Sequence, residues 1–171
     1  SATTNLIGDP DTSVGTALPG TEARIKDGAE TGEIEARGPH VMVGYYRNPE
    51  ATRATIDADG WLSTGDIGRF DEQGRLHIVG RSKEIIIRSG FNVYPQEVEA
   101  ALNDHPAVVQ SAVVGRAADG NEEVLAFVQV ADLAATDEAT LKAHVAERLS
   151  GYKRPSRVVL TLQLPAAPTG K

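Results

Sequence analysis

The first half of the chain alternates apolar and polar residues, which is typical of half-buried β-strands. Residues 20–38 alternate on both sides of a turn rich in Gly and Asp, and they predict a β-hairpin. Two more strands are predicted at 67–70 and 76–79, joined by the turn "DEQG". Between these two hairpins, Asn48 as cap and Pro49 at the first helical position predict a short helix.

The second half has a different rhythm, in which helical periodicity alternates with β-branched runs. The segment "PQEVEAALNDH" starts with Pro95 and places Val98, Ala101 and Leu102 on one helical face. The runs "AVVQSAVVG" and "EEVLAFVQV" predict strands separated by a polar loop at 116–121, and "SRVVLTL" predicts one more strand.

The segment "TDEATLKAHVAERLSG" is the clearest helix of the sequence. Thr136 is its predicted N-cap and Gly151 its predicted stop. Leu141, Val145 and Leu149 form its expected buried stripe. The order strand, helix, strand, strand, helix, strand then predicts a small α+β sandwich with its helices on one sheet.

The change of rhythm falls inside "GRSKEIIIRSGFNVYPQEVE", residues 80–99. This segment joins a cluster of charges, a run of isoleucines, a glycine turn and a helix start. We place the domain boundary between Ser82 and Lys83. The prediction is a β-rich first domain of residues 1–82 and a small α+β domain of residues 83–171.

Composition narrows the class of protein. The 171 residues include no cysteine and four scattered histidines, so neither a disulfide framework nor a metal cluster is expected, and a reducing cytoplasm suits the chain. The net charge of −7 argues against broad nucleic-acid binding, which needs a basic face. No apolar run approaches the ~20 residues of a membrane helix. Because the net charge is negative, any anionic ligand must be bound by a few cationic side chains at specific positions.

Three residues are candidates for binding an anionic nucleotide. Asp66 in "STGDI" can accept hydrogen bonds from both hydroxyls of a ribose, but it also fits a plain Asx turn between strands. Arg81 offers a planar fork of donors to a ribose or phosphate oxygen, and it equally fits a surface ion pair. Lys171, directly after "LPAAPTG", offers a compact charge to a phosphate or is an ordinary exposed lysine.

The motifs "GEIEARGPHVMVGYYRNPEAT", "WLSTGD", "LHIVGRSKE", "SGFNVYPQEVE", "YKRP" and "LPAAPTGK", in this order, resemble the adenylate-forming superfamily. That superfamily includes acyl-CoA synthetases, luciferases and peptide-synthetase adenylation domains. The resemblance implies that residues 1–82 are the barrel-like last section of a large adenylating domain and that residues 83–171 are its lid domain. It also implies an enzyme that uses ATP to convert a carboxylic acid to an acyl-adenylate and then transfers the acyl group to a thiol.

The resemblance gives individual residues roles. Asp66 matches the carboxylate that holds both ribose hydroxyls of ATP, and Arg81 matches the arginine that steadies the ribose and phosphate side. Lys83 matches the hinge at which the small domain rotates between the two half-reactions. Lys171 matches the catalytic lysine that bridges the acyl carboxylate and the α-phosphate.

Within the superfamily, "SGFNVYPQEVE" and "GYKRP" resemble the CoA ligase form of these motifs. The resemblance assigns Ser89, Gly90 and Phe91 to the turn that lines the pantetheine tunnel after rotation, where a glycine lets the thin arm approach the backbone. Tyr152 is expected to stack on the adenine of CoA, and Arg154 to pair with a CoA phosphate. A tyrosine at the edge of the core and a solvated arginine are the alternatives.

The resemblance further implies that this chain is a fragment. The phosphate loop, the acyl pocket and the ligands of the Mg²⁺ that accompanies ATP are expected in a preceding part of the enzyme, so the chain alone is not expected to catalyse adenylation. The favoured interpretation is a fragment of a cytoplasmic acid–CoA ligase whose partners are a small carboxylic acid, ATP, CoA and the rest of the enzyme. Two alternatives stay open: an adenylation domain that loads a carrier protein, and a non-catalytic binding module with the lid fold.

Overall fold

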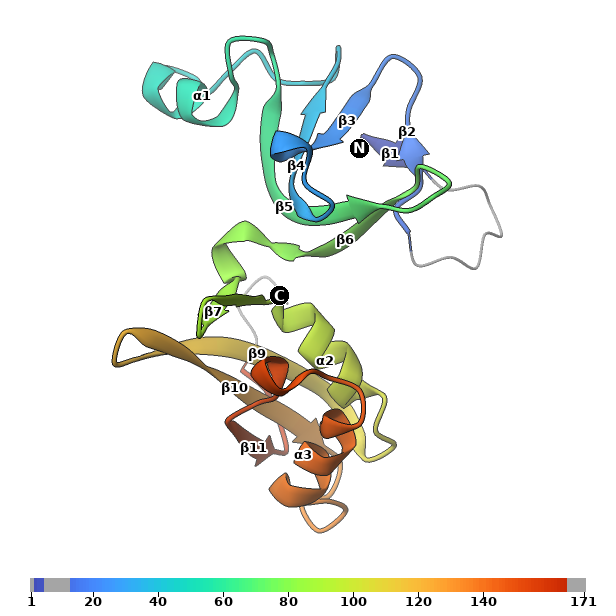
Figure 1. Ribbon diagram of the computed structural model, residues 1–171, viewed down its shortest axis with the longest axis vertical. Helices are drawn as coiled ribbons and strands as arrows, with labels where there is room; N and C mark the ends of the chain where they lie inside the picture. The colour runs from blue at the N-terminus through green and yellow to red at the C-terminus, as the bar shows by residue number, and fades with distance from the viewer. Residues whose placement is uncertain (1, 5–12, 166–171) are drawn as a thin grey trace. The chain divides into compact units, whose positions relative to one another are not determined.

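The computed structural model describes residues 2–4 and 13–165, and the chain divides into two compact units, residues 1–83 and 84–171 (Figure 1). The boundary predicted from the sequence lies one residue earlier, between Ser82 and Lys83. The assignment of these parts to a large adenylating domain and a lid stays a prediction. Each unit has its own sheet and its own hydrophobic core.

The first unit is built on a four-stranded antiparallel sheet in which sequential strands are neighbours. The strands are β3 (Glu22–Ile25), β4 (Gly32–Arg37), β5 (Leu62–Phe70) and β6 (Leu76–Arg81). The 3₁₀ turn η1 (Lys26–Gly28) connects β3 to β4, and a second antiparallel pair is formed by β1 (Thr3–Thr4) and β2 (Thr16–Ala17). Both hairpins predicted from the alternation of the first half are confirmed.

The helix between the two hairpins is α1 (Pro49–Thr55), and it begins as predicted. The Asn48 side-chain oxygen accepts a hydrogen bond from the Ala51 amide at 3.0 Å, and Pro49 occupies the first turn, where its missing N–H costs nothing. None of the residues of α1 is buried. The helix therefore contributes no residue to the core of this unit, and Ile25, Ile34 and Leu76 of the sheet form a buried cluster there.

The turn between β5 and β6 is organised by one carboxylate. Asp71 Oδ1 accepts hydrogen bonds from the amides of Gln73 and Arg75 at 3.0 and 2.8 Å. Its Oδ2 lies 2.9 Å from Arg75 Nε and 3.0 Å from His77 Nε2. The hydrogen bond to His77, helped by those from Arg75, holds the pKa of Asp71 well below its ordinary value of 3.8.

This lowered pKa predicts how Asp71 contributes to stability as a function of pH. A carboxylate whose pKa falls on folding stabilises the fold above its unfolded pKa, and the contribution is lost as the pH falls through the folded value. We expect Asp71→Asn to lower the free energy of unfolding at neutral pH. The difference in this free energy between variant and parent should disappear as the pH falls below 3.8. Denaturant titrations across this range measure it, with Glu72→Gln in the same turn as the control. A difference in free energy of unfolding that stays constant with pH would contradict this role of the Asp71 carboxylate.

The second unit contains a three-stranded mixed sheet, a separate hairpin and two α-helices. In the sheet, β9 (Val108–Ala118) and β10 (Asn121–Val130) are antiparallel, and β10 is parallel to β11 (Arg157–Thr161). The hairpin consists of β7 (Ile86–Arg88) and β8 (Phe91–Val93), and the α-helices are α2 (Pro95–Asn103) and α3 (Glu138–Ala146). Two 3₁₀ turns complete the description: η2 (Ser82–Glu84), at the junction of the units, and η3 (Gly151–Lys153).

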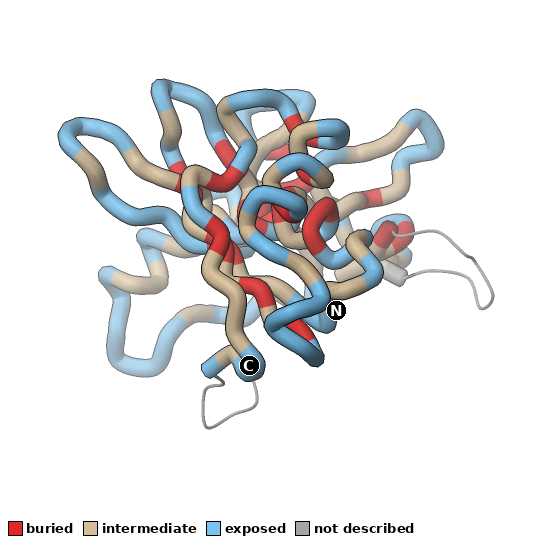
Figure 2. The backbone as a smooth tube through the Cα atoms, turned by 90° about the horizontal axis from the view of Figure 1, so that it is seen from below, coloured by how far each residue is buried: buried red, intermediate tan, exposed pale blue. Residues whose placement is uncertain are grey.

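The core of the second unit lies between one face of the sheet and the two helices. Val124, Ala126, Val128 and Val130, which alternate along β10, are all buried, and the helices contribute a set that includes Val98, Ala101, Leu102, Leu141 and Val145. Buried stretches are short in Figure 2 because only alternate strand residues and one stripe of each helix face the core. The predicted α+β fold with helices on one face of a sheet is confirmed.

Three local predictions in this unit are wrong. The strands β9 and β10 continue through most of the predicted loop at 116–121, and only Asp119 and Gly120 connect them. The N-cap of α3 is Asp137, whose carboxylate accepts a hydrogen bond from the Thr140 amide at 2.7 Å, and not Thr136. An ionised cap also gains from the helix dipole, which explains why the carboxylate takes this position.

The third error concerns the end of α3. The helix stops at Ala146, five residues before the predicted stop at Gly151. Arg154 donates from Nη2 to the Ala146 carbonyl and from Nε to the Leu149 carbonyl, both at 2.9 Å. The bond to Ala146 satisfies a carbonyl that the helix end leaves without an intrahelical donor, and the bond to Leu149 satisfies a carbonyl in the segment that follows the helix.

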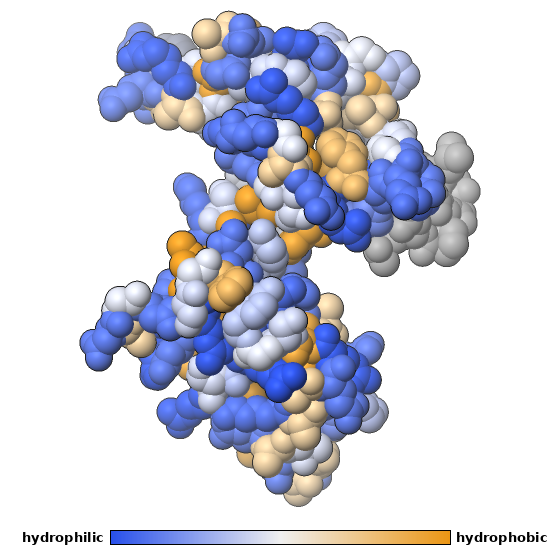
Figure 3. All heavy atoms as spheres, in the orientation of Figure 1, coloured by the Kyte–Doolittle hydropathy of each residue, from blue (hydrophilic) through white to orange (hydrophobic). Residues whose placement is uncertain are grey.

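The surface is largely polar. The face drawn in Figure 3 is mainly hydrophilic, in keeping with the net charge of −7, and apolar side chains emerge on it in small groups. Across residues 2–4 and 13–165, no helix is both long and apolar enough to cross a membrane.

Candidate functional site

Asp66 lies within a strand and not in a turn, which corrects the sequence analysis. The strand β5 begins at Leu62, five residues before the predicted start, and it includes the whole "STGD" motif. The pairing of β5 with β4 is irregular here: Glu35 is opposite Ser63, but Glu33 is opposite Ile67. Between these two pairs, three residues of β5 are opposite the single residue Ile34 of β4, and the surplus forms a bulge that contains Asp66.

Thr64 and Gly65 shape this bulge. The Thr64 hydroxyl donates to the Ile34 carbonyl on β4 at 2.8 Å and accepts from the Asp66 amide at 3.1 Å. It thus replaces bonds that the interrupted strand pairing cannot supply. Gly65 has a φ of +75°, a value that side-chain-bearing residues adopt only under strain. Thr64 was not among the residues predicted from the sequence, although it stands two positions before the aspartate in the same motif.

Asp66 and Arg81 form an ion pair across neighbouring strands. They are directly opposite on β5 and β6, so their side chains leave the same face of the sheet. Arg81 Nε lies 3.2 Å from Asp66 Oδ1, with the arginine side chain 65% exposed and the aspartate 32%. The pair is open to solvent and accessible to a ligand. Asp66 also borders a cavity of about 370 Å³ inside the first unit, lined mainly by apolar residues such as Ile34 and Leu76.

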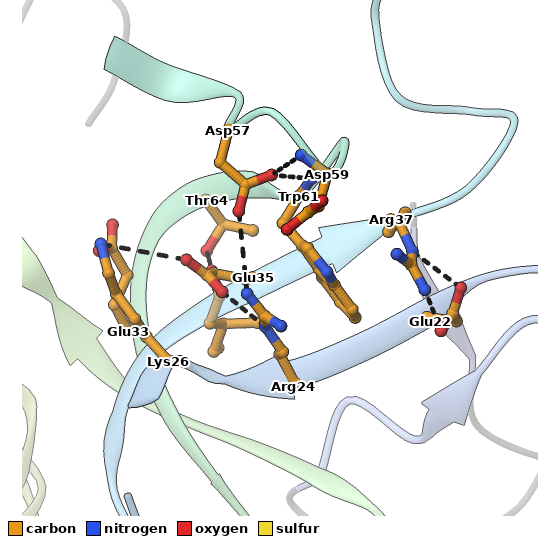
Figure 4. Close-up of polar contacts among 11 residues, drawn as sticks. Glu22, Arg24, Lys26, Glu33, Glu35, Arg37, Asp57, Asp59, Trp61 and Thr64 are labelled. Carbon is orange, nitrogen blue, oxygen red and sulfur yellow. Dashed lines mark hydrogen bonds and ion pairs between the residues drawn. The ribbon is translucent and has the colours of Figure 1, made fainter. Parts of the chain in front are cut away.

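The start of β5 is fixed by a polar network around Trp61 (Figure 4). The Trp61 ring packs against two guanidinium groups, 4.0 Å from Arg24 and 4.6 Å from Arg37. Arg24 in turn donates to the buried Glu35 at 2.7 Å, and Asp57 accepts a hydrogen bond from the Trp61 amide at 2.9 Å. These contacts hold the "WLSTGD" strand in register, so that the bulge and Asp66 keep their positions.

The predicted tunnel residues form the tip of the β7–β8 hairpin in the second unit. Arg88 pairs with Phe91, so the turn consists of Ser89 and Gly90 alone. Their φ values are +53° and +81°, and positive φ at both positions is what the type I′ hairpin turn requires. A Cβ atom at Gly90 would meet no atom within 4 Å, so its surroundings are open.

The "GYKRP" segment packs against this hairpin. The Tyr152 ring stacks on Phe91 with 4.7 Å between centroids and an interplanar angle of 26°. Arg88 Nη1 donates to the carbonyls of Tyr152 and Arg154 at 3.3 and 2.6 Å. The structure thus brings together Phe91, Tyr152 and the backbone of Arg154, while the guanidinium of Arg154 is bonded to carbonyls at the end of α3.

Lys153 is anchored to the helix behind the hairpin. Its Nζ lies 2.6 Å from Glu97 Oε1 on α2. Burial alone would lower the pKa of Lys153, but the hydrogen bond and the charge of Glu97 outweigh it and raise the pKa above the ordinary value. This ion pair keeps η3, and with it Tyr152, close to the hairpin.

The two remaining predicted residues are placed differently. Lys83 is exposed in the 3₁₀ turn η2, at the last position of the first unit. Lys171 lies outside the described residues, as does most of "LPAAPTGK". For metals, the part of the chain that the structure describes offers no group of three or more His, Cys, Asp or Glu side chains able to hold an ion. We therefore assign no Mg²⁺ site to it.

Comparison with known proteins identifies the class. Residues 97–171 match the family described as the AMP-binding enzyme C-terminal domain. A sulfoacetate–CoA ligase from Cupriavidus necator is 41% identical over 160 residues, which are 89% of this chain and 31% of the relative. A 3-[(3aS,4S,7aS)-7a-methyl-1,5-dioxo-octahydro-1H-inden-4-yl]propanoyl:CoA ligase from Rhodococcus jostii is 45% identical over 161 residues, 94% of this chain and 31% of the relative.

A solved structure indicates the same class of protein. ATP-bound MatB from Rhodopseudomonas palustris matches 95% of this chain and 35% of its own with a TM-score of 0.86 and 39% sequence identity. Residues 97–171 match the C-terminal domain of AMP-binding enzymes, and nearly the whole chain is similar to adenylate-forming enzymes. The two curated relatives described above are CoA ligases, and the chain spans about a third of their length.

Proposed function

We propose that this chain is the ATP-ribose-binding and thiol-transfer part of an acid–CoA ligase. In the first half-reaction a carboxylate oxygen attacks the α-phosphorus of ATP, the bond to the bridging oxygen breaks, and pyrophosphate leaves. In the second, the CoA sulfur attacks the acyl carbon, the thiol proton is lost, and AMP leaves with the electrons of the acyl–oxygen bond. The products are acyl-CoA, AMP and pyrophosphate.

The Asp66–Arg81 pair is the observation that carries this proposal. An aspartate accepts two hydrogen bonds from a vicinal diol, and an adjacent arginine donates to ribose or phosphate oxygens. Both groups leave one face of the sheet at a bulge, and they are accessible to a ligand. The position of Asp66 is set by Thr64, so the acceptor is pre-organised for the ribose before ATP binds.

The second unit supplies the groups for the thiol step in this proposal. The Ser89–Gly90 turn and Phe91 form the rim along which the pantetheine arm lies, since Gly90 presents no side chain and has open surroundings. Tyr152 is half-buried, with Phe91 stacked on its ring and Lys153 Nζ 5.7 Å from the ring centroid, and in this proposal the exposed part of its ring contacts the adenine of CoA. Arg154 remains the proposed phosphate partner, for which its guanidinium must share or exchange its carbonyl contacts.

The proposal does not specify which carboxylic acid the enzyme activates. The two relatives described above are named for sulfoacetate and for a bulky fused-ring propanoate, yet they are 41% and 45% identical to this chain. Near-equal similarity to ligases of such different acids argues that selectivity for the acid is determined outside the matched region.

The proposal is tested with a full-length enzyme that carries this chain. We measure acid-dependent exchange of pyrophosphate into ATP for the first half-reaction and acyl-CoA formation for the second, over a panel of small, aromatic and long-chain acids. A parallel reaction replaces CoA by a carrier protein with its phosphopantetheine arm. Acyl-CoA supports the proposal, acylation of the carrier alone supports the carrier-loading alternative, and the absence of exchange with every acid overturns it.

Asp66→Ala is expected to weaken ATP binding in this enzyme. The substitution removes an acceptor for both ribose hydroxyls, and hydrogen bonds to a charged group contribute roughly 1.5–3 kcal/mol each. We therefore expect the KM for ATP to rise about tenfold or more in pyrophosphate exchange, with the KM for the acid little changed. Asp59→Ala, which removes an exposed carboxylate of the same unit, is the control. An unchanged KM for ATP would leave Asp66 only a role in the bulge.

A further inference from the structure

The tips of two hairpins in the second unit are joined by side-chain contacts that the proposed chemistry does not use. Asn121 and Glu122 begin β10, directly after the two-residue turn from β9. Asn121 Oδ1 accepts a hydrogen bond from the Ser89 amide at 2.6 Å, and its Nδ2 lies 3.4 Å from Ser89 Oγ. Glu122 Oε2 accepts from the Ile87 amide at 2.5 Å.

These contacts satisfy backbone groups that the β7–β8 hairpin leaves unpaired. Arg88 and Phe91 flank the two-residue turn and form its hydrogen-bonded pair, so the next pair, Ile87 and Asn92, turns its amides outward. The Ile87 amide therefore needs an acceptor outside the hairpin, and Glu122 supplies it. A Cβ atom at Gly115 would lie 3.3 Å from Glu122 Oε1, so the glycine leaves room for this carboxylate.

Ser89 has the stronger requirement for support. Its φ of +53° lies in the left-handed region, which is unfavourable for a residue with a Cβ atom. Such a conformation persists where surrounding contacts hold it, and residues of this kind are common at functional sites. Asn121 contacts both the amide and the hydroxyl of this one residue, so it is placed to hold the turn in this form.

We propose that Asn121 is a positioning residue for the thiol-transfer step. By holding Ser89 in its left-handed conformation, it fixes the path of the Ser89–Gly90 turn and thus the rim along which the pantetheine arm is bound. Glu122 assists by fixing the preceding strand through the Ile87 amide. This inference rests on the proposed function, because it takes the turn as part of the CoA site.

The test compares three variants in the full-length enzyme. Asn121→Ala removes the acceptor, Asn121→Asp restores an acceptor for the Ser89 amide in the same place, and Asp119→Ala is a control in the adjoining turn. We expect Asn121→Ala to lower kcat/KM for CoA about tenfold, mainly through KM, which is the effect of losing one ordinary hydrogen bond. Pyrophosphate exchange should stay at the parent rate. Asn121→Asp should recover most of the loss, and Asp119→Ala should behave as the parent.

A second measurement needs only the 171-residue chain. The exchange of the Ser89 amide with deuterium, followed by NMR, should be about tenfold faster in Asn121→Ala and near the parent rate in Asn121→Asp. Protection of core amides on β10, such as that of Val128, should not change. Faster exchange throughout the unit would instead show a general loss of stability and would overturn a specific positioning role.

Gly90→Ala separates failure of this inference from failure of the proposed function. A Cβ atom strains the turn through its φ of +81° without a clash, so a CoA site at the turn must respond to it. If Gly90→Ala impairs use of CoA and Asn121→Ala does not, the positioning role is wrong and the CoA site stands. If neither variant changes the KM for CoA, the turn is not part of the CoA site, and both assignments fail.

Discussion

Replacing Lys171 by alanine in the full-length enzyme is expected to slow adenylate formation by about 10²–10³, the usual effect of removing one electrostatic group from a transition state. Lys171 lies outside the described residues, and the role that we propose for it is the one implied by the resemblance of "LPAAPTGK" to the closing motif of adenylate-forming enzymes. In the first half-reaction the acyl carboxylate approaches the negatively charged α-phosphate. An ammonium group between the two anions reduces their repulsion, and this benefit is largest where the new bond forms.

The second half-reaction should respond differently to Lys171→Ala. Once the adenylate exists, attack by the thiol no longer brings the carboxylate and the phosphate of ATP together. The variant supplied with acyl-adenylate and CoA should therefore form thioester at close to the parent rate. Acetylation of Lys171, which removes the same charge, should reproduce the first defect. Lys142→Ala, which breaks a surface pair with Glu138 on α3, is the matched control.

Two results would contradict this role. Adenylate formation at the parent rate in Lys171→Ala would make the residue an ordinary surface lysine. An equal loss in both half-reactions would indicate a general effect on the fold or on ATP binding. Pyrophosphate exchange and single-turnover transfer from supplied adenylate, measured on one preparation, distinguish these outcomes.

The sequence predicted the regular elements well because periodicity reports directly on burial. Val98, Ala101 and Leu102 were placed on one face of a helix, and all three are buried. The strand at β11 and the capped start of α1 at Asn48 were equally clear, since each depends on a few adjacent residues. Features of this local kind need no knowledge of the partner strands.

The features of the candidate site depend on contacts between distant segments, and these were not predicted. The "STGD" motif reads as a turn because Gly65 and Asp66 disfavour strands, yet pairing with β4 and β6 on both sides keeps it in the sheet as a bulge. The hydrogen bond that the Ser89 amide donates to Asn121 Oδ1 joins residues 32 positions apart. Nothing in the sequence near either residue indicates the other.

The N-cap of α3 shows a different limit. Thr136 and Asp137 are adjacent, and both are favourable caps, so sequence alone gives little reason to prefer one. In the structure Asp137 bonds the Thr140 amide, and the hydroxyl of Thr136 is buried without a hydrogen-bond partner. A shift of one residue in the chain entering the helix decides between them, and that path is set by tertiary packing.

The remaining prediction concerns the junction of the two units. Lys83 is exposed at the centre of the 3₁₀ turn η2, and the compact units divide directly after it. The resemblance to adenylate-forming enzymes predicts that this residue is the hinge, which has to change its backbone dihedrals between the half-reactions. An exposed residue at the end of a compact unit can do so with little loss of packing.

Lys83→Pro in the full-length enzyme should leave adenylate formation close to the parent rate and reduce thioester formation steeply. The ring fixes φ near −65°, a value compatible with a 3₁₀ turn, and it prevents the change that rotation requires. Lys83→Ala is the control, because it removes the charge and keeps the backbone free, and it should support both half-reactions. Pyrophosphate exchange and single-turnover thioester formation measure the two steps.

Proline also disfavours the helical conformation of the preceding Ser82, so local damage to the fold is the competing explanation. Such damage would lower the rates of both half-reactions together. That result would contradict a hinge at Lys83, and so would a defect of equal size in Lys83→Ala.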